Sequence, residues 1–109
     1  LYESTRKNYR RREENGSAKW GNASTLNKKY RDKNASENKL LTQSVRIGLD
    51  GKKHRRNLNI LVVGGSGAGK TRFFCKPNVM QCNTSMVILD PKGEIVRDTG
   101  GLLEKKGYE

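Results

Sequence analysis

The glycine-rich segment Gly64–Thr71 constrains the fold of this 109-residue chain more than any other feature. Its residues, Gly-Gly-Ser-Gly-Ala-Gly-Lys-Thr, fit the pattern G-x-x-x-x-G-K-[ST] of phosphate-binding loops without exception. The apolar run Ile60–Val63 precedes the segment, and residues that can form a helix follow it. A continuously apolar strand, a glycine loop and a helix in this order begin a parallel α/β sheet. We therefore expect an α/β fold containing part of a P-loop parallel sheet.

Each part of this segment has a role in holding a nucleotide phosphate. Lys70 would reach the β- and γ-phosphates, and the Thr71 hydroxyl would bind the Mg²⁺ that bridges them. The small residues before them let backbone N–H groups wrap the anion at the positive end of the following helix. These cradle residues are Gly64, Gly65, Ser66, Gly67, Ala68 and Gly69. A random chain of this length would match the pattern less than about one time in a hundred.

A second apolar run, Met86–Leu89, ends in the turn signal Asp90-Pro91-Lys92-Gly93. Asp90 is the further candidate Mg²⁺ ligand, because a second acid should help to hold the ion. Pro91 follows it, so no adjacent glutamate is available to polarise water. Asp90 could instead cap the turn. We favour an Asp90 that lines the nucleotide or substrate side without being the principal Mg²⁺ acid.

The remaining pattern predicts a few further elements. Val45, Ile47 and Leu49 alternate with polar residues, which is typical of a half-buried strand. Proline lacks an amide hydrogen, so Pro77 should end the helix that follows the loop and could open a second short turn. We also expect a short helix capped by Ser24 or Thr25, a basic loop at Lys52–Arg56, and a helix at Glu94–Lys106 that Gly107 ends.

Charge divides the chain unevenly. Residues 1–59 hold 16 Lys and Arg against 6 Asp and Glu, a net charge of +10, whereas residues 60–109 carry only +2. Such a basic segment favours polyanions, either nucleic acid or an anionic membrane face, and the alternative is a solvated linker. We divide the chain into a basic, largely irregular arm or juxtamembrane linker, 1–39, and the first part of a P-loop domain, 40–109.

Two cysteines, Cys75 and Cys82, and the single histidine, His54, exclude a four-ligand zinc site within one chain. No apolar run approaches the roughly 20 residues that a membrane span requires. The low apolar fraction of 32% argues against a large closed core and suggests a piece of a longer protein.

From Asn59 onward the sequence resembles the coupling proteins of type IV secretion, the TraG/TraD-type conjugative DNA-transfer ATPases. The matching pieces are Gly64–Thr71 with Arg72-Phe73-Phe74, then Lys76-Pro77-Asn78, and then Asp90–Glu94. Gly16–Gly21 is similar to an element ahead of the ATPase core in many members. Asp-Pro-Lys at this place is also similar to the FtsK/HerA DNA-pumping motors.

The resemblance implies a RecA-like motor domain, a membrane anchor, a hexameric ring and ATP-driven movement of single-stranded DNA. It implies ATP and Mg²⁺ as cofactors, with Arg72 added to the nucleotide-binding residues. It also implies other type IV secretion components as partners and a place at the cytoplasmic face of the cell membrane. The family's Mg²⁺ acid and its glutamate would then lie on a later strand, beyond Glu109.

Two other functions are compatible with the sequence. One is a different P-loop enzyme, such as a small-molecule kinase or a GTPase, although no Asn-Lys-x-Asp base-reading motif follows the loop. The other is a binding module whose basic half grips DNA or anionic lipid while the P-loop is idle. Salt-sensitive DNA binding without nucleotide binding would favour this module.

Overall fold

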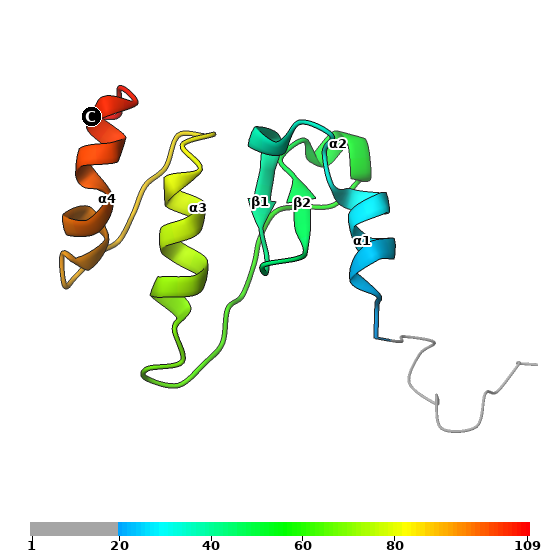
Figure 1. Ribbon diagram of the computed structural model, residues 1–109, viewed down its shortest axis with the longest axis horizontal. Coiled ribbons are helices and arrows are strands. Elements are labelled where there is room, and N and C mark those ends of the chain that lie inside the picture. Colours follow the sequence, from blue (N-terminus) through cyan, green and yellow to red (C-terminus); the bar gives the residue numbers. More distant parts are fainter. Residues whose placement is uncertain (1–19) are drawn as a thin grey trace, which may run out of the picture.

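The computed structural model describes residues 20–109 as short helices arranged around one small β-hairpin (Figure 1). In the view of Figure 1, α1 and α2 lie at one side of the hairpin, α3 lies at the other, and α4 flanks α3. The elements in chain order are α1 (Ala23–Tyr30), the 3₁₀ turn η2 (Ala35–Glu37), β1 (Asn38–Leu40), β2 (Arg46–Gly48), α2 (Gly51–His54), the π-helical η3 (Lys70–Cys75), α3 (Lys76–Met80) and α4 (Glu94–Lys105).

Strands β1 and β2 pair antiparallel, with Lys39 opposite Ile47. The strand predicted around Ile47 is thus confirmed, although it is shorter than the alternating pattern. Its partner, β1, crosses the boundary placed at 39/40 between the arm and the P-loop domain. The loop before β1 is fixed by the fully buried side chain of Asn38, which bonds the backbone N–H and C=O of Asp32 at 2.7 and 3.1 Å.

Both short helices of the N-terminal half begin at a side-chain cap. The Asn22 side chain accepts from Ser24 N–H at 2.8 Å, so the prediction of Ser24 or Thr25 as the cap of α1 is wrong. Asparagine is at least as good an N-cap as serine, and here it lies two residues before Ser24. The Asp50 side chain caps α2 in the same way, so the first part of the expected Lys52–Arg56 loop is helical.

The helix after the glycine loop changes type just before Pro77: η3 ends at Cys75, and the short helix that the proline was expected to open is confirmed as α3, although no break separates the two. It begins as the π-helix η3 and continues directly into α3, with Pro77 in the first turn of α3. The register changes just before the proline, where Lys76 N–H bonds to the carbonyl of Thr71. A proline inside a continuous helix removes one backbone hydrogen bond and crowds the preceding turn, and here it lies directly after the change of register.

Helices α3 and α4 pack against each other around Val79 and Ile95, which are 7% and 9% exposed. Lys76 of α3 bonds both Glu94 and Asp98 of α4, at 2.7 and 2.5 Å. The helix predicted at the C-terminal end is confirmed. It ends as expected at Gly107, whose left-handed backbone forms a two-bond Schellman cap with the preceding turn.

The two apolar runs expected to be buried strands are not paired in residues 20–109, where the structure has strands only in the hairpin. Each run has one half-covered and one open face: Ile60 and Val62 are each 38% exposed, but Leu61 and Val63 are 89% and 83% exposed. Met86–Leu89 alternates in the same way, with Val87 and Leu89 open. A parallel strand needs a neighbouring strand to complete its hydrogen bonds. Neither run has such a neighbour in the described residues, so the parallel sheet stays a prediction.

Arg10–Arg12 and most of Gly16–Gly21 lie outside the residues that the structure describes. Between residues 20 and 109 no helix combines the length and the apolar character that crossing a bilayer would require.

Candidate nucleotide-binding site

The glycine loop lies open at the start of η3, and every residue from Gly64 to Ala68 is exposed. Gly67 and Gly69 adopt positive φ angles of 78° and 81°, which side-chain-bearing residues rarely adopt. At Gly69 a Cβ atom would also collide with the ring of Phe73. The glycines are therefore required by backbone geometry, and the loop is shaped as a turn that leads into a helix.

Lys70 folds back over this turn. Its ammonium group donates to the carbonyl of Gly64 at 2.6 Å and to that of Gly65 at 2.8 Å. The predicted phosphate-binding lysine is thereby brought together with the first two residues of the loop. A lysine ammonium group has three donors and no acceptor. Here it donates to carbonyl oxygens of the loop, in the place that phosphate oxygens would otherwise take.

The other two predicted residues of the helix start differ in exposure. Thr71 is half-buried in the first turn of η3. Arg72 is exposed, and its guanidinium lies 5.4 Å from the centre of the Phe73 ring, where a cation–π interaction holds it beside the loop. Both residues lie within one helical turn of Lys70.

Asp90 lies in the turn before α4. Its carboxylate accepts backbone N–H groups of Glu94, Ile95 and Val96 at 3.2, 2.8 and 3.0 Å. Gly93 N–H closes the turn on the Asp90 carbonyl at 3.1 Å, which confirms the predicted turn. A carboxylate is favourable at a helix N-terminus, where free amides and the helix dipole are both positive. This geometry agrees with the capping alternative, and the role of Asp90 towards a nucleotide stays a prediction.

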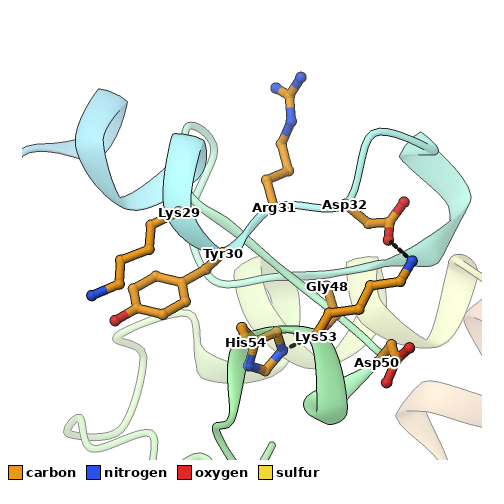
Figure 2. Close-up of a pocket in the computed structure, with 8 residues that line it drawn as sticks. All are labelled: Lys29, Tyr30, Arg31, Asp32, Gly48, Asp50, Lys53 and His54. Carbon is orange, nitrogen blue, oxygen red and sulfur yellow. Dashed lines mark hydrogen bonds and ion pairs between the residues drawn. The ribbon is translucent and has the colours of Figure 1, made fainter.

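A second group of charged residues gathers where α1 meets α2, around a hollow of about 60 Å³ (Figure 2). Figure 2 shows Lys53 reaching across to Asp32, at 2.9 Å, while Arg31 points away from the hollow. The rings of Tyr30 and His54 meet edge to face at 6.0 Å. The hydrogen bond from Arg56, with a second from Lys29, holds the pKa of Tyr30 below its usual range.

The exposed cations around this junction form what we call the basic face. Its members are Lys28, Lys29, Arg31, Lys52, Arg55 and Arg56. They come from α1, α2 and the residues that follow each of them. Residues 20–59 hold 10 Lys and Arg against 3 Asp and Glu, so the net charge of this part is +7.

Sequence reasoning missed the asparagines that connect the hairpin to its neighbours. Asn78 of α3 and Asn27 of α1 bond the outer edges of β1 and β2 through their side-chain amides. Asn78 stood out only as part of Lys76-Pro77-Asn78, and nothing local marks Asn27. Such pairings join residues 17 to 38 positions apart, so only the folded chain shows them.

Comparison with known proteins gives one match. A family model described as type IV secretory system conjugative DNA transfer matches residues 13–109, nearly the whole chain. No curated protein and no solved structure matches the chain significantly.

Proposed function

The chain belongs to the type IV secretory system conjugative DNA-transfer family, and from this premise we propose that it binds ATP and Mg²⁺ as part of a DNA-transfer motor. The observation that carries the proposal is the glycine loop at a helix start, whose residues from Gly64 to Ala68 are all exposed. In the proposed complex the phosphates replace the Gly64 and Gly65 carbonyls as partners of Lys70. Thr71 then supplies a hydroxyl to Mg²⁺, and Arg72 remains at the rim.

The finer parts of this function are proposals that rest on the family. They are a single-stranded DNA substrate, other type IV secretion components as partners, a hexameric assembly, and a place at the cytoplasmic face of the cell membrane. The basic face supports a polyanionic partner, since its six exposed cations come from α1, α2 and the residues that follow each of them.

A RecA-like parallel sheet is likewise a proposal, supported by the alternating exposure of Ile60–Val63 and Met86–Leu89. Each run covers one set of side chains and leaves a second apolar set open. A strand that is apolar on both faces is typical of a sheet covered by helices on both sides. We propose that both runs become paired strands of one such sheet.

The first experiment titrates the chain with ATP and Mg²⁺ by calorimetry. Removing the Lys70 ammonium should weaken ATP binding at least about tenfold, because a hydrogen bond to a charged group contributes roughly 1.5–3 kcal/mol. Lys70→Ala is the test variant, and Lys105→Ala, on the exposed end of α4, is the control. Hydrolysis should be slow or undetectable, because the Asp90 carboxylate is already bonded to three amides.

Equal affinity in wild type and Lys70→Ala would contradict the phosphate-cradle assignment. It would favour the binding module with an idle loop, for which the bonds from Lys70 to the loop's own carbonyls are the specific observation. Rapid steady-state hydrolysis by the wild-type chain would contradict the assignment of Asp90.

A further inference from the structure

The outer edges of the β-hairpin are bonded by side chains from two different helices. On β1, the Asn78 amide donates to the carbonyl of Leu40 at 2.8 Å, and its oxygen accepts from Leu40 N–H at 2.8 Å. On β2, the Asn27 oxygen accepts from Arg46 N–H at 3.0 Å, and its amide donates to Ser44 C=O at 2.5 Å. A primary amide can do this because it offers a donor and an acceptor side by side, as a peptide group does.

Asn78 also connects the hairpin to the glycine loop. Its amide donates to the Phe74 carbonyl at 2.9 Å, within η3, and η3 begins at Lys70. Asn83 adds a second connection, with bonds to the carbonyls of Ser36 and Asn38 at 2.8 and 3.0 Å. Asn78 therefore bonds both η3 and β1.

Asn27 continues the connection from β2 to α1. It belongs to α1, whose last turn carries Lys28 and Lys29, and α1 lies against β2. The chain of contacts thus runs from Lys70 through Asn78, the two strands and Asn27 to the basic face. Every link is a helix, a strand pair or a two-bond amide contact.

A phosphate on the glycine loop would change the bonds at the start of this chain. Without ligand, Lys70 bonds the loop's own carbonyls and η3 holds a π-turn closed by Lys76 N–H on Thr71 C=O. A bound phosphate would take both Lys70 and the Thr71 hydroxyl, and π-turns are strained segments that often mark functional positions. Both Lys70 and Thr71 lie at the end of η3 where a ligand would act.

We infer that Asn78 and Asn27 are positioning residues that couple occupancy of the glycine loop to the affinity of the basic face for a polyanion. This inference rests on the proposed function, since it requires a nucleotide on Gly64–Thr71. Coupling is reciprocal, so the polyanion must change nucleotide affinity by the same factor as nucleotide changes polyanion affinity. Couplings of this kind are commonly about fivefold or more.

The test measures the affinity of the full chain for a non-hydrolysable ATP analogue with Mg²⁺, with and without saturating oligothymidylate. In wild type the two values should differ by about fivefold or more. Asn78→Asp and Asn27→Asp keep the side-chain shape but replace the donating amide by a carboxylate oxygen, which faces the carbonyl of Leu40 or Ser44. In each variant the ratio should fall to within about twofold of unity, while either ligand alone still binds.

Asn59→Asp is the matched control. It adds the same charge at an exposed position before the loop, and it should keep the wild-type ratio. A wild-type ratio retained in Asn78→Asp, or ligands that bind the wild type independently, would overturn the inference and leave the proposed function intact. Failure of the wild type to bind the analogue would instead overturn the proposed function itself.

If the variants do not fold, hydrogen exchange measured on the wild-type chain tests the inference instead. The amide of Leu40 is bonded by Asn78, so its hydrogen exchange reports on this contact. The analogue should slow exchange at Leu40 and, through Asn27, at Arg46 by about threefold or more, as expected when binding rigidifies a connected path. Exchange rates at both amides that do not respond to the analogue would overturn the inference.

Discussion

Lys76 joins the helix that follows the glycine loop to α4 by its charge. Its side chain is 16% exposed and bonds the carboxylates of Glu94 and Asp98. The hydrogen bond to Asp98, and then that to Glu94, raises the pKa of Lys76, and Lys76 in turn holds the pKa of Asp98 below its ordinary value. A lowered carboxyl pKa means that this contribution to stability is present above about pH 4 and is lost as the pH falls through the folded-state pKa.

Asp98→Asn should therefore flatten the dependence of stability on pH in the acid range. Urea midpoints measured between neutral pH and pH 3 should converge for wild type and variant as Asp98 becomes protonated. Glu104→Gln, an exposed carboxylate on the same helix, is the control and should follow the wild-type curve. Parallel curves for Asp98→Asn and wild type would show that the ion pair contributes nothing to folding.

Gly69 allows a second prediction at the scale of single residues. Gly69→Ala should destabilise the chain by about 1–3 kcal/mol, because alanine is strained at positive φ, and its Cβ atom would also collide with Phe73. Gly67→Ala is the matched control, since it has the same backbone sign but open space at its Cβ. Thermal melts should rank Gly69→Ala below Gly67→Ala, and adding Phe73→Ala should remove the difference. A Gly69→Ala protein as stable as wild type would contradict the observed loop.

At the scale of elements, Pro77 fixes the hydrogen-bond register of the helix that carries Lys70. Pro77→Ala supplies an N–H that can continue the α-helical pattern back into η3. We expect Lys76 N–H to move its bond from Thr71 to Arg72, with Phe74 and Cys75 shifting relative to the hairpin. Hydrogen-bond couplings in nuclear magnetic resonance spectra would report the partner of Lys76. Pro91→Ala, in the turn before α4, is the control. An unchanged bond to Thr71 in Pro77→Ala would show that the proline does not set the register.

The elements that sequence reasoning found are those encoded by neighbouring residues. Glycines needed at positive φ mark the loop and the end of α4, and Asp90 with its following proline and glycine marks a turn. The elements that it leaves open depend on distant parts of the chain. Ile60–Val63 has the composition of a buried strand, but pairing requires partner strands that the sequence pattern alone does not supply. The contacts of Asn78 and Asn27 were invisible for the same reason.

At the scale of the whole molecule, the basic face and the glycine loop lie in different parts of the structure. The basic face lies where α1 meets α2, on the far side of the hairpin from α3 (Figure 1). Residues 20–59 carry a net +7, and residues 60–109, which contain the glycine loop, carry +2. Binding of a polyanion should therefore depend on the first part and should be strongly weakened by salt, because each neutralised phosphate releases counterions.

Replacing Lys28, Lys29 and Arg31 with glutamine should flatten the plot of log affinity against log salt for single-stranded DNA. Each phosphate contact contributes about 0.7 to the slope, so losing three should reduce it by about 2, whatever the base sequence. Arg97, Lys105 and Lys106 replaced by glutamine provide a control of equal charge on the α4 side. The same substitution of Arg10–Arg12 tests the arm, which lies outside the described residues.

A slope that neither basic set changes would mean that the basic half of the chain is a solvated linker. Anionic liposomes that bind far better than DNA would identify it as a membrane-proximal stem, because a lipid surface also presents phosphate but offers no unpaired bases. DNA contact would then rest on the family alone, since the glycine-loop half carries too little positive charge to provide it.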